Sequence, residues 1–128
     1  MDPYIELCVE LLQPLGPVRP LRMFGGHGLY VDGLFMALVI QNDVSNRWSE
    51  ITIVAPVTST VRFPLNPVHV LLAAGEATGL SVTSVALLNQ IRAVDRIRLI
   101  KRLGRVDDET MERADEAIKI SLGLVRQQ

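Results

Sequence analysis

Residues 28–41 read GLYVDGLFMALVIQ, and this stretch decides the fold that we expect. Two short apolar runs are separated by Asp32-Gly33, and both residue types tolerate the positive φ angles of a two-residue hairpin turn. The second run, from Leu34 to Gln41, is short and almost wholly apolar, as is typical of a strand buried on both faces. The sequence therefore predicts an antiparallel hairpin that forms the first two strands of a small curled sheet.

Further strand patterns follow the hairpin. Residues 51–58 form a β-branched run interrupted by Pro56, which has no N–H to donate and so predicts an edge or a bulge near the end of that strand. Residues 68–72 and 84–91 are two more strand candidates. The segment 42–49, between the runs 34–41 and 51–58, is rich in Asn, Asp and Ser and predicts a polar loop.

Both ends of the chain show helical patterns. Near the carboxyl end, Asp107 or Asp108 is a capping residue, and Gly123 suits the stop. The apolar and small residues of this helix recur every three or four positions: Met111, Ala114, Ile118, Ser121 and Leu122. At the amino end, a helix capped by Asp2 is expected to end at Pro14.

Strands followed by a helix, joined by antiparallel hairpins, predict an α+β domain: a small β-barrel or curled sheet with a C-terminal helix and an added N-terminal helix. The 128 residues are enough for one domain. Hydrophobic residues make up 48% and 13 basic side chains face 14 acidic ones, which excludes wholesale disorder and a polybasic tail.

The composition of the chain also indicates where the protein works and whether it forms oligomers. The longest apolar run, residues 34–40, is far shorter than the roughly 20 residues of a membrane-spanning helix, so we expect no membrane span. The acidic start of the chain argues against export and favours the cytoplasm, where the single Cys8 is expected to be a buried, inert thiol. The mean hydropathy is high for so short a chain and indicates a homodimer.

Two groups of polar residues are candidates for chemistry, and no spacing typical of a metal site occurs. Between Ile91 and Val106 there are six basic residues and one acidic residue. If they lie on a short helix or turn, they could line the path of an anionic polymer. Alternatively, they form a solvated helix face whose cations pair with the acidic C-terminal helix. The hydroxyls of Thr58, Ser59 and Thr60 end a strand. They suit phosphodiester transesterification, or they are ordinary turn residues.

Four blocks in order make the chain resemble a known family over residues 37–128. The blocks are Ala37–Asp43, Ile53–Ser59, Val85–Arg92 with Asp95, and Asp108–Leu124. They are similar to the MazF/PemK family of toxin endoribonucleases. The resemblance implies an SH3-like barrel with a C-terminal helix, a homodimer, and metal-independent and cofactor-free cleavage of single-stranded RNA that leaves a 2′,3′-cyclic phosphate. It also implies a cognate antitoxin that blocks the RNA groove.

The resemblance also implies roles for individual residues. Thr58 matches the catalytic threonine that stabilises charge on the phosphate. The expected RNA-binding residues, at or beside motif positions, are Asn42, Asn46, Arg47, Ser59, Asn89, Gln90 and Arg92. Asn89 stands where the family commonly has an acidic residue.

The chain departs from the family ahead of Ala37. The family has an Arg-Pro there whose arginine is the catalytic acid or base, whereas Phe35-Met36 occupy those positions here. Arg19, Arg22 or Arg47 is then the expected positive group. Residues 1–39 instead resemble the start of the TfoX N-terminal domain, which predicts a hybrid of a TfoX-like helix and hairpin (residues 1–36) and a MazF-like barrel and helix (residues 37–128).

The missing Arg-Pro leaves a second function open. A catalytically impaired MazF-like protein acts by binding a protein partner: an antitoxin, another toxin, gyrase or a nuclease. A third interpretation is competence regulation through the TfoX-like segment. In both alternatives the activity does not depend on Thr58.

Overall fold

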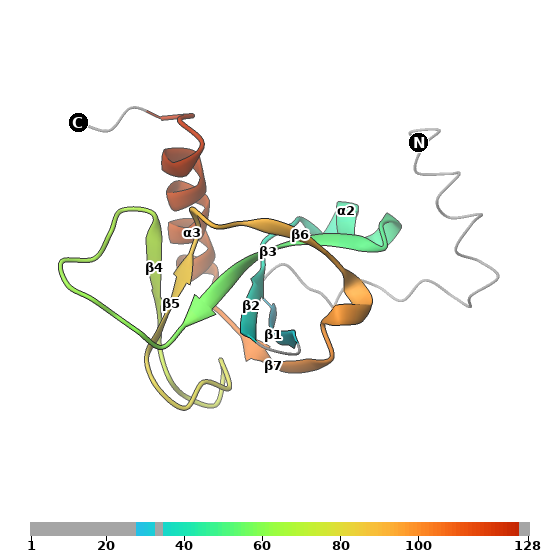
Figure 1. The fold of residues 1–128 in the computed structure, drawn as a ribbon, viewed down its shortest axis with the longest axis horizontal. Coiled ribbons are helices and arrows are strands. Elements are labelled where there is room, and N and C mark those ends of the chain that lie inside the picture. Colours follow the sequence, from blue (N-terminus) through green and yellow to red (C-terminus); the bar gives the residue numbers. More distant parts are fainter. Residues whose placement is uncertain (1–27, 33–34, 126–128) are drawn as a thin grey trace.

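The computed structural model describes residues 28–32 and 35–125, and the N-terminal helix expected between Asp2 and Pro14 lies outside them. Figure 1 shows one curled antiparallel sheet with a long helix beside it. The elements are β1 (Gly28–Asp32), β2 (Phe35–Val39), α2 (Asp43–Trp48), β3 (Ile51–Thr58), β4 (His69–Leu72), β5 (Ser84–Leu87), β6 (Arg92–Asp95), the 3₁₀ helix η3 (Arg96–Arg98), β7 (Lys101–Arg105) and α3 (Asp108–Ser121).

The sheet is a half-barrel. Its strands follow the order β4-β5-β3-β2-β1-β7, and β6 pairs with β3 beyond the end of β5. The end strands β4 and β7 are not paired with each other in the described part of the chain. The curled sheet with a C-terminal helix is thus confirmed, and in the described residues it is a half-barrel and not a closed barrel.

The hairpin at the start of the sheet is confirmed. β1 and β2 pair antiparallel from Leu29 opposite Leu38 to Asp32 opposite Phe35. The two residues that join them, 33 and 34, lie outside the described part. β2 crosses the expected boundary between residues 36 and 37, so both sides of that boundary share one strand.

Pro56 lies in an interior strand, but its lack of an N–H removes no hydrogen bond between β2 and β3. The amide of Ile40 donates to the carbonyl of Ile53 at 2.9 Å, so by alternation the pair of Ala37 and Pro56 is not hydrogen-bonded and the Pro56 nitrogen faces the other edge of β3. On that edge β6 pairs with residues 51–54 and β5 with residues 57–58. Pro56 therefore sits at a local edge, as its position in the sequence predicted.

The two faces of the sheet carry separate apolar clusters. The larger cluster joins side chains of the sheet, such as Leu38 and Val57, to Met111 and Ala114 of α3, which packs against β4. The smaller cluster, on the opposite face, is Tyr30, Ala37, Val39, Val54 and Val94. Because neighbouring residues of a strand point to opposite faces, these clusters fix which face every strand residue occupies.

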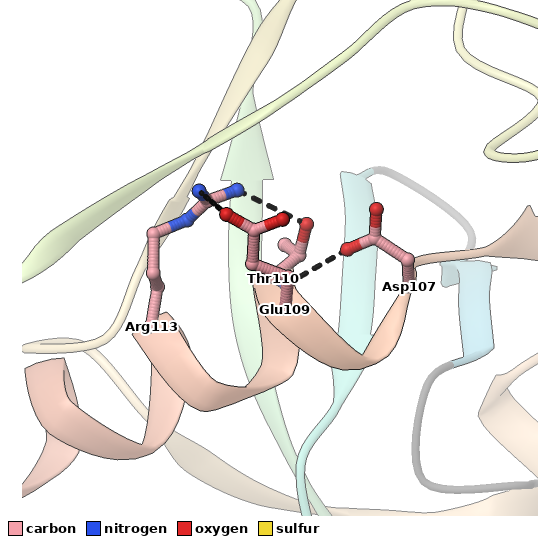
Figure 2. A network of polar contacts seen from close by, with 4 residues as sticks. All are labelled: Asp107, Glu109, Thr110 and Arg113. Carbon is pink, nitrogen blue, oxygen red and sulfur yellow. Dashed lines mark hydrogen bonds and ion pairs between the residues drawn. The ribbon is translucent and has the colours of Figure 1, made fainter.

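The helix α3 begins and ends as its sequence predicts. Figure 2 shows that the Asp107 carboxylate accepts the amide of Thr110 at 2.8 Å, and that Arg113 contacts both Glu109 and the Thr110 hydroxyl. The helix stops before Gly123, whose φ of 73° is in the left-handed region that a glycine tolerates. Within the described residues, no helix is long and apolar enough to cross a membrane.

A connection packs tightly against β7. The amide of Arg105 donates to the carbonyl of Ala77 at 2.8 Å, and Gly104 lies directly under the backbone of Ala77 and Thr78. A side-chain carbon at Gly104 would collide with that backbone. This glycine allows the segment between β4 and β5 to rest on the sheet.

Three predictions of local structure are wrong. Residues 43–48 form a short helix instead of a polar loop, because Asn42 caps it by accepting the amide of Ser45 at 2.8 Å. The strand expected over residues 84–91 ends at Leu87, where a turn begins. The basic segment 91–106, expected as a helix or turn, is mostly the strands β6 and β7, which obtain their hydrogen bonds from distant partners.

Candidate functional site

The candidate site lies on the sheet face opposite α3, where β2 begins and β3 ends. Met36 pairs with Val57, and both belong to the α3 side of the sheet. One step further along this register, Phe35 comes opposite Thr58, and alternation turns both side chains to the other face. Phe35, one of the two residues that stand where the family has Arg-Pro, is therefore the neighbour of the expected catalytic Thr58 on the adjacent strand.

Arg92 reaches the same place from the other edge of β3. It is the first residue of β6 and pairs with Val54, a member of the small cluster, so it shares the face of that cluster. Its guanidinium carbon lies 5.2 Å from the centroid of the Phe35 ring. The exposed Arg92 side chain thus crosses β3 and ends over Phe35, beside the end of β3 that carries Thr58.

The Thr58 hydroxyl is half-buried and already oriented. Its oxygen accepts the amide of Thr60 at 3.2 Å, a contact that uses one lone pair and not the O–H. The Thr58 hydroxyl can therefore still donate its proton in a hydrogen bond to a phosphate oxygen. Ser59, the next residue, is exposed beyond the end of β3.

The turn between β5 and β6 brings amide side chains to this edge of β3. Asn89 and Gln90 are exposed, while Leu88 before them is fully buried and anchors the turn. The amide of Gln90 donates to the carbonyl of Leu87 at 3.1 Å. β5 pairs with residues 57–58 of β3 and β6 with residues 51–54, so the backbone of the turn that carries Asn89 and Gln90 lies between those two paired stretches.

Asn42 and Arg47 belong to α2, which packs against β3. Asn42 is exposed and caps the helix, and Arg47 is exposed with its guanidinium carbon 5.9 Å from the centroid of the Trp48 ring. Figure 1 shows α2 beside the start of β3, whereas Thr58 is the last residue of that strand. The structure therefore separates these two expected RNA-binding residues from the Thr58 group.

Asn46, one of the expected RNA-binding residues, is not at the surface of this structure. The side chain has no exposed area. Its Oδ1 accepts from Gln41 at 2.9 Å and from the Thr52 hydroxyl at 2.6 Å, while its Nδ2 donates to the Gln41 carbonyl at 2.9 Å. Asn46 therefore connects α2 to the sheet through hydrogen bonds. A sequence motif alone does not distinguish this structural role from RNA binding.

One cation of the basic segment is also structural. Arg96 is half-buried and donates to the carbonyls of Asn46 and Ser49 at 3.1 Å each, at the carboxyl end of α2. Burial lowers the pKa of Arg96, and burial raises the pKa of the nearby Tyr30. The other five cations of that segment are exposed, so most of the expected basic surface is present.

Comparisons with known proteins identify the family of the chain. The profile of the family described as "PemK-like, MazF-like toxin of type II toxin-antitoxin system" matches residues 25–122. The chain belongs to this family. The MazF-like toxin is also 43% identical over 93 residues to the endoribonuclease EndoA of Bacillus subtilis (strain 168), an alignment that covers 73% of this chain and 79% of EndoA. It is a type II toxin endoribonuclease homologous to EndoA.

Solved structures share the fold of this MazF-like toxin. An endoribonuclease from a mycobacterial species has a TM-score of 0.68 at 22% identity, covering 77% of this chain and 90% of its own. The MazE-MazF complex of Deinococcus radiodurans has a TM-score of 0.64 at 24% identity, covering 79% and 96%. At these identities the likeness establishes the curled sheet and helix alone.

The family match also bears on the start of the MazF-like chain. It begins at residue 25, so it includes both strands of the hairpin that we had assigned in part to a TfoX-like segment. The comparisons give no support to a TfoX-like segment or to a hybrid chain. Arg19 and Arg22 lie outside the described residues. Within the described residues, no three His, Cys, Asp or Glu side chains gather as a metal site would require.

Proposed function

We propose that this MazF-like toxin cleaves single-stranded RNA without a metal ion, at the rim of the sheet face opposite α3. The observation that carries the proposal is the convergence of Thr58 and Arg92 on one face at the end of β3, next to the turn that carries the exposed Asn89 and Gln90. A hydroxyl, a guanidinium and two carboxamides are the groups that hold a phosphodiester and stabilise added negative charge.

The reaction we propose is transesterification within the RNA. The 2′-oxygen attacks the adjacent phosphorus, the bond from phosphorus to the 5′-oxygen breaks, and the products are a 2′,3′-cyclic phosphate and a 5′-hydroxyl. The proton lost by the 2′-hydroxyl passes to water, and the leaving 5′-oxygen takes a proton from water. Thr58 donates to a non-bridging oxygen, and Arg92 stabilises the charge of the phosphorane. Because a guanidinium keeps its proton at neutral pH, it is a better charge stabiliser than proton donor.

Arg19 and Arg22 complete the proposal as candidates for a second positive group. The Phe35-Met36 pair leaves the family's arginine position without a cation, and either N-terminal arginine would supply it if it reached the Thr58 end of β3. Arg19→Gln and Arg22→Gln, made separately, test this assignment. A tenfold or larger loss of cleavage in one of them supports it, and unchanged cleavage in both removes these residues from the site.

The partners that we propose are a second copy of the chain and a cognate antitoxin, in the cytoplasm. A mycobacterial relative of the same fold was solved as an endoribonuclease in complex with its cognate antitoxin. Large apolar side chains on the surface suit such interfaces: Ile51, Phe63, Val82, Ile97, Ile100, Leu122, Leu124 and Val125.

The proposal is tested by incubating the purified protein with single-stranded RNA in excess EDTA. We expect cuts that end in a 2′,3′-cyclic phosphate, and we expect them to disappear in Thr58→Ala. The matched control is Thr83→Ala, which makes the same change at an exposed threonine before β5. RNA that stays intact with the native protein, or equal cleavage by Thr58→Ala, contradicts the proposal.

One observation favours a second function. Phe35 and Met36 replace the Arg-Pro of the family, so a protein that only binds a partner is the alternative. It predicts that the growth effect of expressing the protein persists in Thr58→Ala. Growth that recovers in Thr58→Ala excludes this alternative.

A further inference from the structure

We propose that Phe35 is a positioning residue that holds the Arg92 guanidinium at the Thr58 end of β3, so that Arg92 supplies the cation for the reacting phosphate. The inference rests on the proposed RNA cleavage and names the residue that organises it. It assigns a role to an aromatic side chain at the one place where the chain departs most clearly from the pattern expected of its family.

The first support is the path of the Arg92 side chain. In the ladder, Arg92 lies opposite Val54, four residues before Thr58 on the same strand. Its guanidinium nevertheless lies over Phe35, which the register places opposite Thr58. The Arg92 side chain therefore extends along β3, so that its positive charge lies closer to the Thr58 hydroxyl than its backbone does.

The second support is the chemistry of the stack. A guanidinium attracted to the face of a ring lies against it, and its N–H groups remain at the edge, where they bind a phosphate in two-point fashion. Stacking and phosphate binding thus use different parts of Arg92. Because a long arginine side chain samples many rotamers, a ring that restrains it lowers the entropic cost of placing it in the transition state.

The third support is that the stack is not part of the core. Neither Phe35 nor Arg92 belongs to the buried clusters, Arg92 is exposed, and Phe35 is only half-buried. An exposed stack contributes little to the folded state, so its removal is expected to change the rate of cleavage far more than the melting temperature. The Arg47–Trp48 contact differs, since it joins sequence neighbours within one helix.

The test compares Phe35→Leu, which keeps the apolar volume but removes the ring, with Phe35→Tyr, which keeps the ring. We expect Phe35→Leu to lower kcat on single-stranded RNA about tenfold, within the range of one cation–π contact, with KM within twofold and Tm nearly unchanged. Phe35→Tyr is expected to restore most of kcat. The ring-current shift of the Arg92 side-chain NMR signal should vanish in Phe35→Leu and return in Phe35→Tyr.

A double variant separates this role from a general structural one. Arg92→Gln is expected to lower kcat at least as much as Phe35→Leu, and adding Phe35→Leu to Arg92→Gln should cost nothing more, because the ring then has no cation to place. The matched charge control is Lys119→Gln on α3, at the opposite face of the sheet. It removes one exposed cation without touching the stack.

The outcomes distinguish this inference from the function on which it rests. If the native protein cleaves RNA and Thr58→Ala does not, but Phe35→Leu retains native kcat, the inference is overturned and the function stands. Equal losses in Phe35→Leu and Phe35→Tyr, or additive losses in the double variant, overturn it as well. If the native protein does not cleave RNA at all, the proposed function fails first.

Discussion

The two faces of the sheet differ in what they hold. The face under α3 carries the larger buried cluster, including Leu29, Leu38 and Leu88, none of which has any exposed area. The opposite face carries a small cluster whose rim holds Thr58 and the stacked Arg92. Most of the buried apolar side chains therefore lie on the α3 face, and the proposed chemistry lies at the rim of the other face. Substitutions on the two faces should therefore change different observables.

The largest effect is expected at the rim, in Thr58→Ala. Loss of a single donor to a phosphorane oxygen should lower kcat for RNA cleavage by about 10²- to 10³-fold, a range known from other single donors to oxyanions. Because Thr58 is only half-buried, Tm should move by no more than a few degrees. Parallel kinetic and thermal-unfolding measurements check this. A large fall in Tm with an equal fall in activity would contradict the separation of the two faces.

The next effect is expected in Gly104→Ala, where a connection rests on β7. The added methyl group meets the backbone of Ala77 and Thr78, which cannot move without breaking the hydrogen bond from Arg105 to Ala77. Overpacking of this kind costs about 1–3 kcal/mol of unfolding free energy. Urea denaturation measures it, and Gly75→Ala is no control because its φ of 147° is itself strained. An unchanged midpoint would show that the connection is not fixed to the sheet.

A smaller effect is expected in Asp107→Ala at the start of α3. The carboxylate accepts the amide of Thr110 at 2.8 Å, and losing this cap should cost about 1 kcal/mol (Figure 2). Asp107→Asn, which retains the acceptor, should recover most of it. Cleavage per folded molecule should stay constant throughout. A change in kcat for Asp107→Ala would show that α3 also acts on the rim.

The smallest effect is expected in Arg113→Gln, also on α3. Arg113 lies 3.4 Å from Glu109 on an exposed part of the helix, and such pairs contribute about 0.5 kcal/mol or less. Raising the salt concentration should reduce even this difference. A loss above 1 kcal/mol by urea denaturation would show that the network in Figure 2 is stronger than its exposure implies.

The sequence predicted the elements whose signals are local. The Asp32-Gly33 turn between two apolar runs gave the first hairpin, and the spacing of Met111, Ala114 and Ile118 with an aspartate cap gave α3. Each of these patterns is complete within a few neighbouring residues. Local patterns therefore located both elements, although β2 spans Phe35–Val39 and not the whole run from Leu34 to Gln41.

The elements that the sequence did not predict depend on distant partners. β6 and β7 are rich in arginine and lysine and carry little apolar alternation, yet they pair with β3 and β1, far away in the chain. Asn46 was expected to bind RNA because it matches a motif position of the family, whereas its hydrogen bonds to Gln41 and Thr52 form only when α2 packs on the sheet. The same limit hid the contact between Arg92 and Phe35.

The main proposal is that RNA binds at the rim of the sheet face opposite α3. It is tested most directly by following backbone amide NMR signals while adding a single-stranded RNA whose 2′-hydroxyls are methylated, so that it binds without being cleaved. We predict the largest shifts at Thr58, Ser59, Gln90 and Arg92, and shifts near zero over the middle of α3. Shifts centred on α3 with an unperturbed end of β3 would contradict the claim.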